Sequence, residues 1–248
     1  MFLQRRIATF VPARGPARGP ALVLALVLAA ALALPARAAD SQQTGWAGWF
    51  SNWKFDQRIG LVSDLQLRSN DQWEGPRNLL VRPGLSWYAA PGHTLSAGYA
   101  YIGTYNRGAP DATEHRIWQQ YVASYTVGAA SLSQRLRLEQ RFIGRPGAPD
   151  TYADRFRWFS RLQWPLHGAL PFTRGSFLAL QNEAMVNLSH RDELNGRFFD
   201  QNRAYIALGW RWSPDTDVEI GYLNQWINGR ERDTINHVLQ VALYTWFR

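Results

Sequence analysis

Ionisable side chains occupy alternate positions in the segment from Ser131 to Phe142. The odd positions carry Arg135, Arg137, Glu139 and Arg141, whereas the even positions carry no charge. Successive side chains of a strand point to opposite faces, so a strand here would have one ionic face. Guanidinium and carboxylate groups on one face can pair with each other, or the arginines can bind phosphate or carboxylate groups of a ligand. The spacing therefore indicates either an ion-pair network or an anion site.

The same alternation recurs in the neighbouring segments, which extends the ionic face to a cluster. Neighbouring strands would place Glu139 among Arg116, Arg137 and Arg157. They would also place Glu183 near Arg161 and Arg203. Because a small barrel fills its interior with side chains, a lumen packed with ion pairs is one interpretation. A lumen that binds or passes anions is the other. The candidate cluster, structural or binding, comprises Arg116, Gln120, Arg135, Arg137, Glu139, Arg141, Arg155, Arg157, Arg161, Gln181, Glu183 and Arg203.

The elements that carry these residues are long strands. Most exceed the ~5–6 residues of a mean strand in soluble proteins and match the ~9–11 residues that a tilted strand needs to cross a membrane. Short turns alternate with long polar loops, as in outer-membrane barrels. We therefore predict an all-β, antiparallel, up-and-down transmembrane β-barrel. Its ten strands are expected at 59–68, 79–88, 94–105, 116–127, 131–142, 155–164, 177–188, 203–212, 218–227 and 237–247.

The other face of these strands is apolar and ends in aromatic residues. An arginine facing lipid at the membrane midplane would cost ~2–4 kcal/mol, which explains why the charges keep to one face. The last strand resembles the C-terminal signal read by the barrel-assembly machinery, although Arg248 follows the aromatic Phe247. That machinery and the outer-membrane lipid are the expected partners. The aromatic girdle at one membrane interface would comprise Trp87, Tyr125, Trp164, Trp210, Trp212 and Phe247.

The N-terminal segment has the features of an export signal. Basic residues precede the apolar run from Ala21 to Leu34, and Ala36-Arg37-Ala38 supplies a small-x-small cleavage pattern. The run is shorter than the ~20 residues of a membrane-spanning helix. We predict a cleaved signal peptide at 1–38 and a location in the outer membrane of a Gram-negative bacterium.

The segment after the signal is ambiguous. Trp46, Trp49, Phe50 and Trp53 have helical spacing, but part of this set also fits one face of a strand. Bacterial single-chain barrels have an even number of strands, so one additional strand is not expected. We predict an aromatic lead-in segment at 39–58 and a barrel domain at 59–248, with twelve strands as the alternative to ten.

Composition excludes several function classes. The net charge is +8, and Arg5, Arg6, Arg14, Arg18 and Arg37 of the N-terminal segment supply most of it, so we expect no nucleic-acid partner. The chain has no Cys and therefore no disulfide framework. No metal-ligand spacing or phosphate-binding loop stands out, so we predict no metal, no cofactor and no catalytic residue.

Two other classes remain as alternatives. Outer-membrane lipases and deacylases use Ser and His near the lipid interface, and Ser189, His190, Arg191 and Asp192 would be the candidates for such an enzyme. A soluble periplasmic, lipocalin-like barrel would have the same alternation with its apolar face inside. The alternation alone does not say which face is the inner one.

Several stretches of the ionic face resemble a known family. The runs Glu114–Gln120, Arg135–Phe142, Asn182-Glu183, Asp200–Arg203 and Gly221-Tyr222 are similar to domain-of-unknown-function family 2490. The resemblance covers roughly 49–247 and implies an exported outer-membrane barrel without an assigned activity. We therefore expect an outer-membrane protein with a structural, ligand-binding or narrow-transport role.

Overall fold

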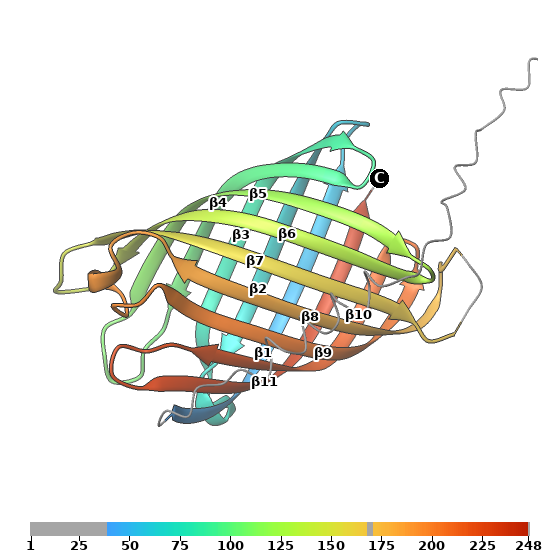
Figure 1. Ribbon diagram of the computed structural model, residues 1–248. Helices are drawn as coiled ribbons and strands as arrows, with labels where there is room; N and C mark the ends of the chain where they lie inside the picture. The colour runs from blue at the N-terminus through green and yellow to red at the C-terminus, as the bar shows by residue number, and fades with distance from the viewer. Residues whose placement is uncertain (1–38, 168–170, 248) are drawn as a thin grey trace, which may run out of the picture. The chain divides into compact units, whose positions relative to one another are not determined.

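The chain folds into a closed β-barrel, seen here in a computed structural model that describes residues 39–167 and 171–247 (Figure 1). Its hydrogen-bonded strand order is β1-β11-β10-β9-β8-β7-β6-β5-β4-β3-β2. The strands are β1 (Ala39–Lys54), β2 (Ile59–Ser69), β3 (Pro76–Ala90), β4 (His93–Thr104), β5 (Ala112–Val127), β6 (Ala130–Gly144), β7 (Thr151–Pro165), β8 (Gly175–Asn187), β9 (Phe199–Ser213), β10 (Thr216–Ile227) and β11 (Asp233–Phe247). Two 3-10 turns, η1 (Asp71–Trp73) and η2 (Arg191–Glu193), lie in loops.

The prediction of an all-β barrel is confirmed. Each of the ten predicted strands corresponds to one of β2 to β11, and most extend further than predicted. Consecutive strands pair in antiparallel fashion, for example with Glu139 opposite Arg155 and Arg137 opposite Arg157. Closure leaves no free sheet edge within the described barrel. In the described part of the chain, no helix is long and apolar enough to cross a membrane. The predicted signal peptide at 1–38 lies outside the described residues.

The strand count differs from the prediction. The barrel has eleven strands in the described residues, not ten or twelve, because the expected lead-in at 39–58 contains β1. β1 pairs with β2 in antiparallel fashion and with β11 in parallel, from Ala39 opposite Asp233 to Trp53 opposite Phe247. An odd ring can close only if one neighbouring pair is parallel, and this seam is that pair. Between residues 42 and 52 the inward positions of β1 carry no charge, so the alternation that revealed the other strands is absent there.

Two rims follow from this topology. The short turns 55–58, 91–92, 128–129 and 214–215 lie at one end of the barrel, which we call the short-turn rim. The connections 70–75, 105–111, 145–150, 188–198 and 228–232 lie at the other end, the long-loop rim, at the left in Figure 1. The loop that contains η1 fastens the start of β1. The backbone N–H of Gln43 donates to Asp71 at 2.7 Å, and Trp73 covers Gly45, where any Cβ would collide with its ring.

The barrel buries its polar side chains and exposes its apolar ones. Glu139 and Glu219 are 0% exposed, whereas Leu85 is 63% and Leu208 56% exposed. The lipocalin-like alternative requires the opposite arrangement, with the apolar face inside.

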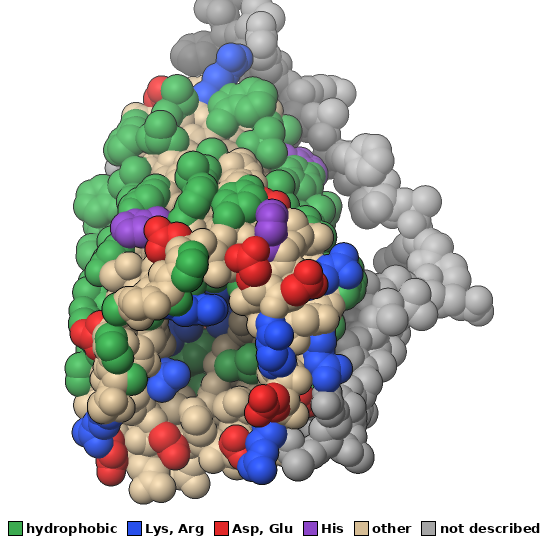
Figure 2. Space-filling view, turned by 90° about the vertical axis from the view of Figure 1, so that its left-hand side faces the viewer, with side chains coloured by type: hydrophobic (Ala, Val, Ile, Leu, Met, Phe, Trp, Pro, Cys, Tyr) green, Lys and Arg blue, Asp and Glu red, His purple; other side chains and the backbone are tan. Residues whose placement is uncertain are grey.

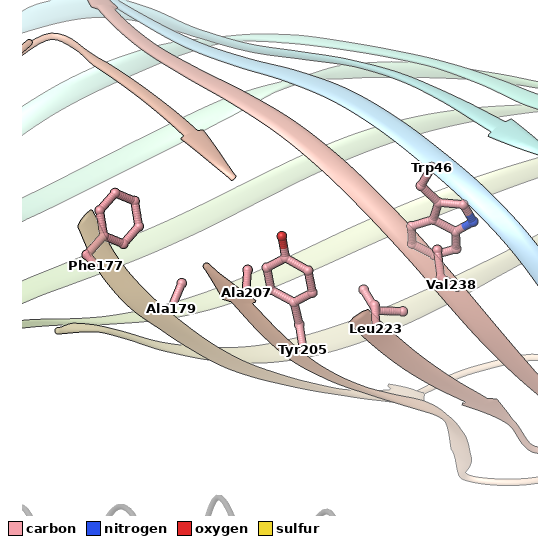
Figure 3. Packing of buried hydrophobic residues seen from close by; sticks show 7 residues of the cluster. All are labelled: Trp46, Phe177, Ala179, Tyr205, Ala207, Leu223 and Val238. Carbon is pink, nitrogen blue, oxygen red and sulfur yellow. The ribbon is translucent and has the colours of Figure 1, made fainter. Parts of the chain in front are cut away.

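The interior also has an apolar wall, which the prediction of an Arg-rich lumen did not include. Side chains of β8, β9, β10, β11 and β1 point towards one another there (Figure 3). This apolar wall consists of Trp46, Phe177, Ala179, Tyr205, Ala207, Leu223 and Val238. Ionic side chains such as Glu183, Arg203 and Glu219 lie on the same strands, so the wall interrupts the ionic lining there without replacing it.

Candidate functional site

The centre of the lumen is built around Glu139 of β6. Its carboxylate accepts hydrogen bonds from Arg157 Nη1 and Arg155 Nη2, both at 2.7 Å. Arg116 Nη1 lies 3.6 Å and Arg137 Nη1 lies 3.8 Å from the same carboxylate. Alternation along β5, β6 and β7 turns all five side chains inward. One fully buried carboxylate therefore serves four guanidinium groups, as the sequence suggested for the neighbours of Glu139.

Glu183 of β8 forms the second centre. Its Oε1 atom accepts from Arg135 Nη2 and Arg157 Nη2, each at 2.7 Å, while Arg203 Nη1 lies 3.7 Å from Oε2. Arg161 lies near Glu183 as expected, since it sits opposite Gln181 on β8, but its guanidinium binds Glu219 of β10. Arg161 lies on β7, next to β8, but its long side chain reaches past β8 and β9. The order of the strands alone therefore does not determine which ionic side chains pair inside a narrow lumen.

Further ion pairs continue the network towards both rims. At the long-loop side, Glu114 accepts from Arg116 Nε at 2.7 Å and also binds Arg141, and Arg155 Nη1 lies 3.1 Å from Asp200. At the short-turn side, a separate pair joins Arg211 Nη2 and Asp217 at 2.8 Å. The network thus fills the mid-barrel with side chains held by charge-assisted hydrogen bonds.

A cavity of about 500 Å³ lies between this network and the short-turn rim. Its wall includes mid-strand residues such as Arg157 and Glu183, and it extends to residues near strand ends such as Ser131, Gln163 and Trp246. Six arginines but only two carboxylates line it: Arg82, Arg135, Arg137, Arg157, Arg161, Arg203, Asp64 and Glu183. The opposite, long-loop end is also hollowed, with basic side chains inside and acidic ones around the mouth (Figure 2).

The twelve residues of the predicted cluster divide between the network and the cavity. Four form the network on its long-loop side, namely Arg116, Glu139, Arg141 and Arg155. The other eight line the cavity, namely Gln120, Arg135, Arg137, Arg157, Arg161, Gln181, Glu183 and Arg203. Arg157 belongs to both because it binds Glu139 and Glu183. The predicted cluster is therefore spatially continuous.

The aromatic supports of the arginines were not identified from the sequence. The guanidinium of Arg137 lies 4.9 Å from the ring centre of Trp118, and that of Arg203 lies 5.2 Å from Trp46. Trp118 is 1% exposed because Gly84 and Gly98 leave room for its indole. The sequence does indicate that Trp118 points inward, because its position in the strand places it on the same face as Arg116 and Gln120. The inward position of Trp46 gave no such signal, because β1 itself was unassigned.

The predicted girdle residues lie on the outer surface, towards the short-turn rim. All six are exposed, from 40% for Phe247 to 68% for Trp212. The set is Trp87, Tyr125, Trp164, Trp210, Trp212 and Phe247. Phe247 also stacks on Trp53 across the parallel seam, with ring centres 4.0 Å apart. Phe247 therefore also contributes to closure of the barrel.

In the loop considered for catalysis, Ser189 and His190 each contact a residue of β7. The hydroxyl of Ser189 donates to Asp154 at 2.8 Å, and His190 packs edge-on against Tyr152 with ring centres 5.7 Å apart. Ser189 and His190 thus have other partners and do not form a nucleophile–base pair. Within residues 39–167 and 171–247, no group of three or more His, Asp or Glu side chains is placed to hold a metal ion.

These features define the class of the protein as an all-β closed barrel with a buried Arg–carboxylate network. The chain belongs to the family described as "Protein of unknown function (DUF2490)", whose family model matches residues 43–236. The family resemblance noted in the sequence is thereby confirmed. The matched region begins within β1, so the family domain includes most of this strand.

An uncharacterized protein of Methylorubrum extorquens is 27% identical over 191 residues, which is 75% of this chain and 80% of that protein. No solved structure matches the chain.

Proposed function

We propose that this protein is an outer-membrane β-barrel that binds a small solute in its lumen, either to hold it or to pass it slowly. The observation that carries the proposal is the inverted distribution of polarity around a closed sheet. Large apolar side chains such as Leu85, Leu208 and Trp212 are more than half exposed, while Glu139 and Glu219 are completely buried. Soluble monomers rarely expose such extended apolar surfaces, whereas lipid requires them.

The dimensions of the strands support the membrane part of the proposal. The strands contain 11 to 16 residues, against the ~9–11 needed for a tilted strand to cross the apolar layer. Because the barrel is closed, the backbone groups of each strand pair with those of its neighbours. A strand in lipid needs these partners, since lipid offers no hydrogen bonds. The aromatic residues near the short-turn rim fit the interface, where amphipathic rings are favoured.

The interior supports binding in preference to an open pore. The cavity of about 500 Å³ falls within the ~300–1,000 Å³ of small-molecule sites. Next to it, the ion pairs of Glu139 occupy the lumen, and Arg137, Arg155 and Arg157 are each about 3 to 4% exposed. An unobstructed channel would keep such side chains hydrated. Binding in a narrow, obstructed lumen therefore accounts for both the cavity and the network.

The test combines location with activity. Membranes containing the protein are washed with alkaline carbonate, and the extracted protein is assayed for heat-dependent gel mobility, single-channel conductance and lipid hydrolysis. We expect retention in the outer-membrane fraction, a heat-dependent shift, conductance far below that of an open porin, and no hydrolysis. Release by carbonate would overturn the membrane assignment, and a large steady conductance would overturn the obstructed lumen.

A further inference from the structure

We propose that the cavity is a binding site for a compact polyanion, a molecule or headgroup that carries phosphate or several carboxylate groups. This inference rests on the proposed solute-binding lumen and names the chemistry of the solute. It is carried by three observations: an excess of arginine over carboxylate, buried guanidinium nitrogens without partners, and aromatic rings that support the arginines without neutralising them.

The excess of positive charge is a property of the whole interior. Among the described residues, the inward-facing ionic side chains of β2 to β10 are eleven arginines and seven carboxylates. The arginines are Arg68, Arg82, Arg116, Arg135, Arg137, Arg141, Arg155, Arg157, Arg161, Arg203 and Arg211. The carboxylates are Asp64, Glu114, Glu139, Glu183, Asp200, Asp217 and Glu219. Buried cations without counter-charges are costly, so the imbalance indicates a negative charge that comes from elsewhere.

The weakly paired part of this charge faces the cavity. Arg82 is 4% and Arg137 3% exposed, yet Arg82 Nε and Arg137 Nη1 have no hydrogen-bond acceptor among the described residues. Arg203 Nε lacks an acceptor as well. The carboxylates nearest to these three side chains lie at 3.6 Å, 3.8 Å and 3.7 Å, beyond a normal N–H···O distance. All three arginines line the same cavity.

Aromatic rings hold several of these arginines in place. Arg137 lies against Trp118, Arg203 against Trp46, and Arg135 lies over the ring of Phe159 at 4.4 Å. A cation–π contact stabilises the guanidinium plane but provides no hydrogen-bond acceptor and no formal charge. The N–H groups that have no acceptor, such as Arg137 Nη1, Arg135 Nε and Arg203 Nε, therefore stay available for an anion.

The chemistry of the cavity selects the class of ligand. A single monovalent anion would leave most of the surplus charge uncompensated, so a ligand with two or more negative charges fits better. Ser86, Ser96, Ser131 and Ser133 also line the wall and offer hydroxyl groups. The volume of about 500 Å³ admits a small molecule such as pyrophosphate or citrate.

Calorimetric titration of the purified protein tests this inference with pyrophosphate and citrate as probes. The protein is taken from whichever cell fraction contains it, so the result is independent of the membrane assignment. We expect saturable binding that weakens as chloride increases, and at least a tenfold loss of affinity in the variants R82Q and R203Q. The matched control is R107Q, because Arg107 is 65% exposed in a loop beside Glu74.

Heat-dependent gel mobility confirms that each variant is folded before it is titrated. A second arm replaces the free anions with detergent micelles that contain a diphosphorylated lipid. Binding of the free anions assigns the site to a solute, and binding of the lipid alone assigns it to a headgroup. The inference is overturned if folded protein binds neither probe class, or if R82Q and R203Q bind as tightly as the wild type and R107Q.

Discussion

Arg157 and Glu139 meet in the centre of the barrel, where Nη1 donates to Oε1 at 2.7 Å and the carboxylate is fully buried. The same guanidinium binds Glu183 through Nε and Nη2. Arg157 thus joins the two carboxylate centres of the lumen. Removal of either carboxylate should affect more than a single pair, since each is shared among several arginines.

We expect E139Q and E183Q to destabilise the barrel strongly. Each substitution keeps the shape but removes the charge that several buried arginines share, and breaking a buried ion pair in this way costs ~3–5 kcal/mol. Substitution of the exposed loop residue Asp150 by Asn is the control, with an expected change of ~0–1 kcal/mol. The measurement is the urea midpoint of unfolding in detergent or lipid. Equal shifts for the loop and core variants would show that the network is hydrated.

The two faces of β6 should differ in their tolerance of arginine. Leu138 points outward, so in a barrel that crosses a bilayer L138R would place a charge in lipid at a cost of ~2–4 kcal/mol. Ser133 lines the cavity, so the charge of S133R would enter the lumen. We therefore expect L138R to reduce assembly in the outer membrane much more than S133R. The amount of heat-modifiable protein is the readout, and similar yields would contradict the assignment of the faces.

The parallel seam should depend on its aromatic contacts. Trp53 and Phe247 stack with ring centres 4.0 Å apart, and Trp49 Nε1 donates to Thr245 at 2.9 Å. We expect a double-mutant cycle of W53A and F247A to give a coupling free energy of ~0.5–1.5 kcal/mol, because stacked rings contribute that much beyond their burial. Urea midpoints of the four proteins provide the measurement. Additive effects would indicate that β1 and β11 do not pair through these rings.

The turn between β1 and β2 should respond to pH through Asp56. Hydrogen bonds from the backbone N–H groups of Arg58 and Ile59, at 2.6 Å and 2.8 Å, lower the pKa of this exposed carboxyl. A lowered pKa in the folded state adds stability above the unfolded value, about 3.9 for Asp. That stability is lost as the pH falls through the folded pKa. We therefore expect the difference in urea midpoint between the wild type and D56N to shrink below pH 4, and a constant difference would contradict this.

The alternation of charged and apolar residues was sufficient to predict ten strands and the class of the barrel. Arg135, Arg137 and Glu139 each occupy the face on which the parity places them. The signal is strong because charges placed at random would scatter over both faces of a strand, whereas here they keep to one. The middle of β1 lacks charged inward residues, and its tryptophans fit a helix as well as a strand, so local sequence does not distinguish the two.

The partners inside the lumen depend on geometry that spacing does not contain. Arg161 passes its neighbouring strand and binds Glu219 on β10, because arginine is long and the lumen is narrow. Arg203 lies against Trp46, a residue far away in the sequence that only closure of the ring brings near. Parity identifies the residues of the interior, but the curvature and register of the whole barrel determine which of them touch.

The parallel seam has a consequence for sidedness. Because β1 and β11 run in the same direction, Ala39 lies at the long-loop rim and Phe247 at the short-turn rim. In a barrel that crosses a bilayer, these two residues face different compartments, unlike the ends of an even-stranded barrel. An epitope joined before Ala39 and another joined after Phe247 would be reached by antibody from opposite sides. In a membrane, the fold would therefore link the two compartments through one continuous polypeptide, with Ala39 and Phe247 each reachable by a different set of molecules.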